Sequence, residues 1–134
     1  MAQSLVLISH GPLCEALKAS TEMIMGPQEN IYTVSLLPDE GQGDFEKKFD
    51  DIVKDLDDFV VFCDLQGGTP CNVISKKIMQ GEDIDLYAGM NMPMVIAFIN
   101  GVLMGTPVDV VQEAASHISH VNDLLLADDD DEDE

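Results

Sequence analysis

Arginine is absent from this chain, and basic side chains of any kind are scarce. The basic residues number 6, all of them lysine, against 26 aspartates and glutamates, which gives a formal net charge of −20. A nucleic-acid partner is not expected, because nothing here could neutralise a phosphate backbone, and protein partners should present neutral or basic surfaces. A phosphate bound to this chain must rest on backbone N–H groups, hydroxyls or lysine. Histidine phosphatases that clamp phosphate with arginine are therefore excluded.

Long hydrophobic runs are also missing, and cysteine is sparse. No apolar run approaches the length of a membrane span, and no basic region precedes the short apolar run near the N-terminus. The 3 cysteines are an odd number in otherwise regular segments, unlike a secreted disulfide framework. We therefore expect a cytoplasmic protein with reduced thiols. Its 134 residues should form one domain, 1–126, followed by a disordered acidic tail, 127–134.

Apolar runs typical of strands alternate with amphipathic helical patterns along the chain. Strands are expected at 5–8, 30–37, 59–63 and 84–87, and helices at 13–25, 44–55, 71–79 and 93–100. A last helix should start after Pro107 and bury Val110, Val111, Ala114 and Ala115. Residues 116–125 fit a continuation of that helix and a short edge strand through 118–124 about equally well. Short connections between alternating elements predict an α/β fold with a mainly parallel sheet, and strand order 2-1-3-4 would place a ligand crevice between the first and third strands.

The stretch 4–12 combines a buried strand with a histidine at its end. Its apolar core, 5–8, is followed by polar Ser9 and His10 and then by Gly11-Pro12, which ends the strand and opens a helix. His10 should therefore lie beside free backbone N–H groups and the positive end of a helix dipole, a setting that suits an anion. From this stretch alone, a histidine that only caps the strand is an equally good interpretation.

A carboxylate and a glycine-rich turn follow the third expected strand. Asp64 ends that strand, and Gly67-Gly68-Thr69-Pro70 leads into a helix. In the expected topology Asp64 and His10 share one crevice, where the carboxylate would accept a hydrogen bond from one ring N–H and leave the other nitrogen as a nucleophile. The glycines let backbone approach an anion, and Thr69 fits the helix N-cap with a hydroxyl for phosphate oxygens. Asn72 either adds an amide to this pocket or braces the turn.

Four motifs stand in a specific order and spacing along the chain. They are Ser9-His10-Gly11, Glu22-Met23-Ile24 with Gly26, the stretch 63–72 (CDLQGGTPCN), and the stretch 89–94 (GMNMPM). Together they resemble the IIA component of the mannose/fructose/sorbose family of the bacterial phosphoenolpyruvate-dependent sugar phosphotransferase system. The resemblance extends from Leu5 to about Leu125.

The resemblance implies a phosphoryl carrier. In this family the histidine that matches His10 takes a phosphoryl group from the phosphocarrier protein HPr and passes it to the IIB component, which serves the membrane components IIC and IID. The aspartate that matches Asp64 binds the other ring nitrogen, and the hydroxyl that matches Thr69, usually a serine, helps to hold the phosphate.

Further expectations complete this assignment. Ser9, Gly11, Gly67, Gly68 and Asn72 are expected to support the phosphate, and neither a cofactor nor a metal is implied. Family members are homodimers that exchange a C-terminal antiparallel strand, which favours the strand interpretation of 118–124 here.

Two other functions stay open from the sequence. One is the related phosphoryl donor subunit of dihydroxyacetone kinase, and the other is a non-catalytic binding module in which phosphorylation of His10 only signals. The Gly-Gly-Thr-Pro-x-Asn turn favours the sugar transport component. His117 and His120 are three residues apart, as in some metal sites, but no third ligand is evident nearby, so an ordinary surface role is favoured.

Overall fold

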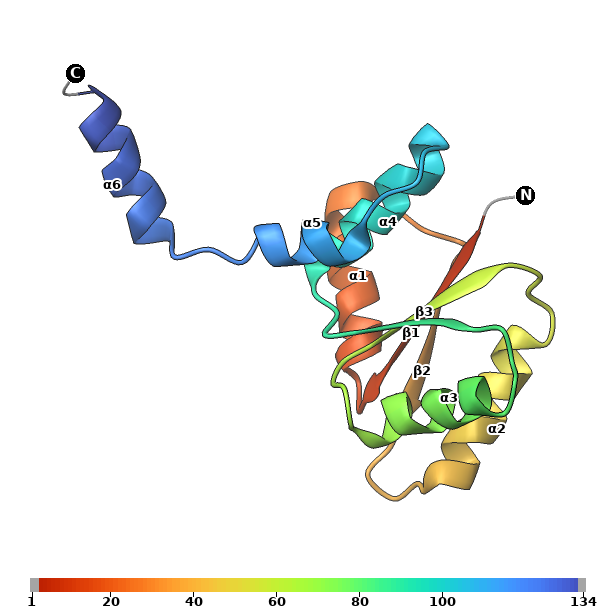
Figure 1. Ribbon diagram of the computed structural model, residues 1–134. Coiled ribbons are helices and arrows are strands. Elements are labelled where there is room, and N and C mark those ends of the chain that lie inside the picture. Colours follow the sequence, from red (N-terminus) through yellow and green to blue (C-terminus); the bar gives the residue numbers. More distant parts are fainter. Residues whose placement is uncertain (1–2, 133–134) are drawn as a thin grey trace.

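A four-stranded parallel sheet forms the centre of the domain in the computed structural model, which describes residues 3–132 (Figure 1). Its strands are β1 (Ser4–His10), β2 (Ile31–Leu36), β3 (Phe59–Cys63) and β4 (Asp85–Ala88). They lie in the order β2-β1-β3-β4, which confirms the predicted topology. In the register, Ile8 is opposite Cys63 of β3, and His10 is opposite Leu36 of β2.

Helices cover both faces of this sheet. The helices that cover it are α1 (Leu13–Met25), α2 (Gln42–Val53), α3 (Thr69–Met79), α4 (Met92–Met104) and α5 (Val110–Ser116), and a further helix, α6 (Val121–Glu132), follows them. Leu5 and Leu7 of β1 pack with residues of α1, α4 and α5, whereas Val6 and Ile8 pack with residues of α2 and α3. The continuous apolar run at the N-terminus follows from this arrangement, because alternate side chains of β1 enter two separate cores.

The short helix α5 buries less than its sequence pattern predicted. Val110 and Ala114 are buried, but Val111 is 59% exposed and Ala115 is exposed as well. A helix of seven residues presents only one narrow stripe to the domain, so positions four apart are buried and their neighbours in sequence are turned to solvent. The prediction that all four residues are buried is therefore wrong for Val111 and Ala115.

The C-terminal segment is helical and not a strand. After α5 the chain runs through an irregular connection, 117–120, into α6, which projects away from the domain (Figure 1). The expected antiparallel edge strand at 118–124 is thus absent from the residues that the structure describes. A segment that lies away from any sheet edge has no neighbouring strand to bond, and a helix is the conformation in which its backbone groups satisfy one another.

The acidic tail falls partly within α6, whose backbone is helical as far as Glu132, whereas Asp133 and Glu134 lie outside the described residues. The expected disorder of the tail and the domain boundary at residue 126 both stay predictions. Among the helices of residues 3–132, none combines the length and apolar composition needed to cross a bilayer.

Candidate functional site

His10 and Asp64 meet at the carboxyl edge of the sheet, where β1 and β3 end side by side. Nδ1 of His10 lies 2.8 Å from Oδ2 of Asp64, and the backbone N–H of His10 donates to the same oxygen at 2.9 Å. The other carboxylate oxygen, Oδ1, accepts the backbone N–H of Leu65 at 2.9 Å. The side chain of His10 is 47% exposed and that of Asp64 is 11% exposed. The imidazole is therefore open to a partner, whereas the carboxylate is fixed behind it.

The protonation of this pair follows from the contacts of the carboxylate. Burial alone would raise the pKa of Asp64, but hydrogen bonds from the backbone and the imidazole of His10, together with the charge of His10, hold this pKa below its ordinary value. Asp64 is then ionised near neutral pH and can only accept hydrogen bonds. In the neutral imidazole, Nδ1 of His10 then carries the proton between them, and Nε2 has the lone pair.

The turn that follows Leu65 brings backbone against the imidazole. A Cβ atom added to Gly68 would stand 2.6 Å from Cε1 of His10 and 3.3 Å from Nε2, so only glycine leaves room for the ring in this position. Gly67 has φ +86°, a left-handed conformation that favours glycine. The Asn72 side chain donates from Nδ2 to the Gly67 carbonyl at 3.0 Å. Asn72 thus braces the turn, and its predicted contribution to phosphate binding stays a prediction.

The amino end of α3 begins beside this turn. Gly68 is the N-cap, Thr69 is the first helical residue and Pro70 the second, so the prediction of Thr69 as the N-cap is wrong by one position. Gly68 takes the cap because it has the extended backbone and the close approach to His10 that a larger residue could not combine. Within residues 3–132 the N–H groups of Thr69 and Cys71 make no hydrogen bond, as is usual for the first turn of a helix. They offer donors to an anion next to the imidazole.

The remaining predicted residues lie on the opposite side of β1 or at its end. Ser9 is buried and its hydroxyl bonds only main-chain groups of its own segment. Gly11 has φ +57° and donates its N–H to the carbonyl of Leu36 at 2.8 Å. The structure therefore gathers His10, Asp64, Gly67 and Gly68 around one point, while Ser9 and Gly11 support the turn behind it. A role of these residues and of Thr69 in holding phosphate stays a prediction.

Sequence analysis missed two main-chain contributors to this arrangement. The N–H of Leu65 fixes the second oxygen of Asp64, and the carbonyl of Leu36 anchors the turn at Gly11. Neither residue type carries a sequence signal for this role, because any residue supplies the same backbone group. The register between strands decides which one is placed there.

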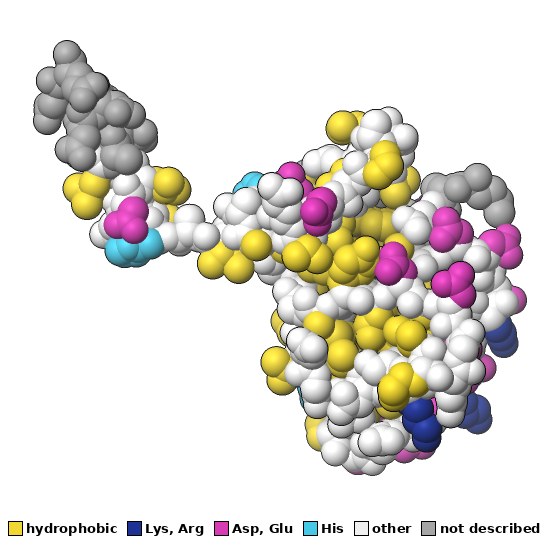
Figure 2. Space-filling view, in the orientation of Figure 1, with side chains coloured by type: hydrophobic (Ala, Val, Ile, Leu, Met, Phe, Trp, Pro, Cys, Tyr) yellow, Lys and Arg dark blue, Asp and Glu magenta, His cyan; other side chains and the backbone are white. Residues whose placement is uncertain are grey.

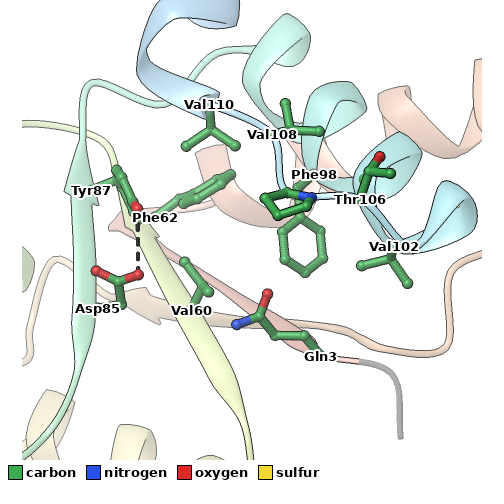
Figure 3. Close-up of a pocket in the computed structure, with 13 residues that line it drawn as sticks. Gln3, Val60, Phe62, Asp85, Tyr87, Phe98, Val102, Thr106, Val108 and Val110 are labelled. Carbon is green, nitrogen blue, oxygen red and sulfur yellow. Dashed lines mark hydrogen bonds between the residues drawn. The ribbon is translucent and has the colours of Figure 1, made fainter.

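A separate hollow of about 490 Å³ lies at the other end of the sheet (Figure 3). It is bounded by Val60 and Asp85, near the starts of β3 and β4, and by the end of α4, with Tyr87 donating to Asp85 at 3.3 Å. His10 and Asp64 instead follow the carboxyl ends of their strands. The lining of the hollow contains no histidine, cysteine or lysine, so the hollow is not part of the His10 site.

No cluster suited to a metal ion is present among the described residues. His117 and His120 each face a neighbouring acidic side chain on the surface: His117 lies 4.0 Å from Glu113 and His120 lies 3.2 Å from Asp123. These contacts agree with the surface role favoured for both histidines.

Comparison with known proteins agrees with this fold and site. Residues 4–115 match the family model EIIA-man, described as "PTS system fructose IIA component". The chain is 29% identical over 100 residues to the fructose-specific EIIA component of Bacillus subtilis, covering 72% of this chain and 68% of that protein. It is 29% identical over 99 residues to the mannose-specific EIIAB component of Escherichia coli, covering 72% of this chain but only 31% of that longer protein.

A solved structure extends the similarity to the fold. The mannose/sorbose-specific IIA subunit from Enterococcus faecalis superposes with a TM-score of 0.75 at 29% identity, covering 90% of this chain and 95% of the subunit. The family match spans most of the chain and includes both His10 and Asp64. This protein belongs to the EIIA components of the mannose/fructose/sorbose family of the sugar phosphotransferase system (PTS).

Proposed function

We propose that this chain carries a phosphoryl group on Nε2 of His10, accepting it from phospho-HPr and passing it to the IIB component. The observation that carries the proposal is the 2.8 Å contact between Nδ1 of His10 and Asp64, which directs the lone pair of the imidazole to Nε2. Sugar would then be phosphorylated as it arrives through the membrane components IIC and IID, which this chain meets only indirectly. Exchange with these partners implies a cytoplasmic location.

The transfer balances without a proton leaving the imidazole. The Nε2 lone pair attacks phosphorus, the P–N bond to the donor histidine breaks, and that histidine keeps the bonding electron pair. The proton on Nδ1 stays between His10 and Asp64, so the carboxylate offsets the positive charge that develops on the ring as the new bond forms. Delivery to the IIB component follows the same steps, with His10 as the donor histidine and the IIB component as the acceptor.

The donors that we expect near Nε2 suit a carrier that must release its group. Free N–H groups at the start of α3 and the hydroxyl of Thr69 are neutral donors, and the chain has no arginine to clamp the phosphate. Weak ground-state binding keeps the phosphoryl group transferable to a second protein. The exposed imidazole allows two partners to reach the same nitrogen in turn.

The experiment is incubation with phosphoenolpyruvate, Enzyme I and HPr, followed by intact mass analysis before and after acid treatment. We expect one acid-labile phosphoryl adduct, lost in His10→Ala and retained in His117→Ala, which removes another exposed histidine. Asp64→Asn should fold normally but accept the group more slowly. The absence of an adduct, while a known acceptor in the same mixture is phosphorylated, would contradict the proposal and favour a binding module. An adduct that cannot pass to a IIB component would favour delivery to another acceptor, such as a kinase subunit.

We propose in addition that two copies of the chain associate through the C-terminal segment. β4 is an edge strand, the apolar hollow lies beside it, and Figure 2 shows hydrophobic side chains on this face of the domain and on α6. Val121, Leu124, Leu125 and Leu126 of α6 are all more than half exposed. Packing of this helix over the hollow and β4 of a second copy would bury these side chains and cover the sheet edge.

Light scattering coupled to gel filtration tests this association. We expect a mass of twice 14.6 kDa for the wild type and of 14.6 kDa for a Leu124→Asp/Leu125→Asp variant. A Leu37→Asp variant is the matched control, because Leu37 is an exposed leucine outside α6 and does not line the hollow. A monomeric wild type at all concentrations would overturn this proposal.

A further inference from the structure

Ser9 adjoins His10 in β1, but its side chain points away from the imidazole. Its exposed fraction is 0%, whereas His10 is exposed, because successive side chains of a strand point to opposite faces. The Ser9 hydroxyl is therefore inside the domain and not on the side where an anion would meet Nε2. Any influence of Ser9 on the reaction must pass through the groups that the hydroxyl bonds.

Those groups lie on both sides of the turn that follows His10. The hydroxyl donates to the carbonyl of Gly11 at 3.0 Å and accepts the backbone N–H of Cys14 at 2.9 Å. Pro12, the N-cap of α1, makes no side-chain hydrogen bond to the helix, so Ser9 satisfies a donor that the helix start would otherwise leave unpaired in the interior. One buried hydroxyl thus ties the end of β1 to the first turn of α1.

The backbone around His10 is anchored at three consecutive points. The N–H of His10 is held by Asp64, the N–H of Gly11 by the carbonyl of Leu36, and the carbonyl of Gly11 by Ser9. Gly11 has φ +57°, so the chain reverses direction at this residue. Asp64 also holds the imidazole itself at Nδ1. The direction in which the ring leaves the backbone depends on all of these contacts.

We propose that Ser9 is a positioning residue for His10: its hydroxyl fixes the turn at Gly11 so that the imidazole stays aligned with Asp64 and presents Nε2. The proposal rests on the proposed function of His10 as a phosphoryl acceptor. Loss of the hydroxyl frees the Gly11 carbonyl and leaves the Cys14 N–H unpaired. The turn then samples other conformations, in which Nδ1 and Asp64 are no longer aligned.

The kinetic test compares the same substitution at two buried serines that face each other in the β1–β2 register. Ser9→Ala removes the turn contacts, whereas Ser35→Ala removes a hydroxyl that donates to Glu15 at 2.8 Å and does not bond the Gly11 turn. We expect Ser9→Ala to lower kcat for transfer from phospho-HPr by about 10- to 100-fold, with KM nearly unchanged, because a misplacement of about 1 Å has this effect on an aligned reaction. Ser35→Ala should lose similar stability and keep its kcat, and Ser9→Thr, which retains the hydroxyl, should recover most of the rate.

A second readout does not depend on phosphoryl transfer. Nitrogen-15 NMR of the imidazole reports which ring nitrogen carries the proton, and the wild type and Ser35→Ala should show protonated Nδ1. Ser9→Ala should show a mixture of both tautomers. Should Ser9→Ala fail to fold, Ser9→Cys, which has nearly the same volume and a weaker donor, should show the same change to a smaller degree.

These outcomes separate the two proposals. Equal kcat and equal tautomer populations in Ser9→Ala and Ser35→Ala would overturn the positioning role. A wild type that accepts no phosphoryl group, with the tautomer change still present in Ser9→Ala, would remove the proposed function and leave the positioning of His10 by Ser9 standing.

Discussion

The contact between Gly68 and the imidazole allows the site to be perturbed by a single methyl group. In Gly68→Ala the new Cβ would stand 2.6 Å from Cε1 of His10. Non-bonded carbon atoms require about 3.5 Å, so the ring must move by about 1 Å. The Nδ1–Oδ2 separation of 2.8 Å would then exceed hydrogen-bonding range unless Asp64 followed the ring. Asp64 is held by two backbone N–H groups and cannot follow freely.

The expected kinetic effect of Gly68→Ala is large and its effect on stability is small. A displacement of about 1 Å lowers the rate of an aligned transfer by about 100-fold, equivalent to about 2.7 kcal/mol of transition-state free energy. The backbone of Gly68, with φ −78° and ψ 166°, is open to alanine without strain. Replacement of glycine under these conditions stabilises by about 0.4–1 kcal/mol through the unfolded chain, which offsets part of the cost of moving the ring.

Gly67→Ala is the matched control on the neighbouring residue. A Cβ there meets nothing within 4 Å, but φ is +86°, so alanine strains the backbone. We expect Gly67→Ala to lose about 1–2 kcal/mol of unfolding free energy in urea with a smaller loss of rate. The assay is single-turnover transfer from phospho-HPr, with imidazole NMR to follow the ring. Wild-type rates in folded Gly68→Ala, with the Nδ1 proton still bonded to Asp64, would refute the steric argument.

Three further predictions concern charge and burial. The pKa of Asp64 in the folded protein lies below its ordinary value, so the stability that Asp64 contributes is present above the ordinary value and is lost as pH falls through the folded pKa. Below about pH 4, urea denaturation should therefore show a steeper loss of stability for the wild type than for Asp64→Asn. Parallel stability curves for the two proteins would contradict this prediction. Lys77 is 6% exposed, and its Nζ lies 2.7 Å from Asp50. Lys77→Met should lower the free energy of unfolding by about 1–3 kcal/mol in thermal or urea denaturation, because it leaves neighbouring carboxylates without their cation. An unchanged denaturation midpoint would show that the ion pair adds nothing to stability. Burial, together with the adjacent Cys71 thiol, raises the pKa of Cys63 to about 12. Iodoacetamide should therefore label Cys63 only after denaturant is added. Rapid labelling of Cys63 in the native protein would refute its burial.

The strands and the site pair could be predicted because each carries a local signal. The run at 59–63 is wholly apolar and matches β3 residue for residue, since a central parallel strand is buried on both faces. His10 and Asp64 are the first charged or titratable residues after two such runs. Parallel strands place their carboxyl ends on one edge, so the 2-1-3-4 order was enough to bring the two side chains together.

The details around that pair depend on contacts that no local pattern encodes. The N-cap of α3 is Gly68 and not the predicted Thr69. Gly68 approaches the ring closely because α3 packs beside the end of β1. The inward direction of the Ser9 hydroxyl follows from strand alternation. Its two partners, however, are main-chain groups beyond the Gly11 turn, and they are in reach only because that turn has its observed geometry.

The C-terminal segment shows the same division most clearly. Residues 116–125 fit a helix and a short strand through 118–124 about equally well, and the sequence by itself left this choice open. What the sequence alone determined is the alternation of elements and the strand ends at which His10 and Asp64 stand, because hydrophobic periodicity and strand ends are local properties. Only the tertiary structure decided the form of the C-terminal segment and the placement of Ser9, Gly68 and Asn72, because backbone hydrogen bonds are completed by whichever partner the folded chain brings within reach.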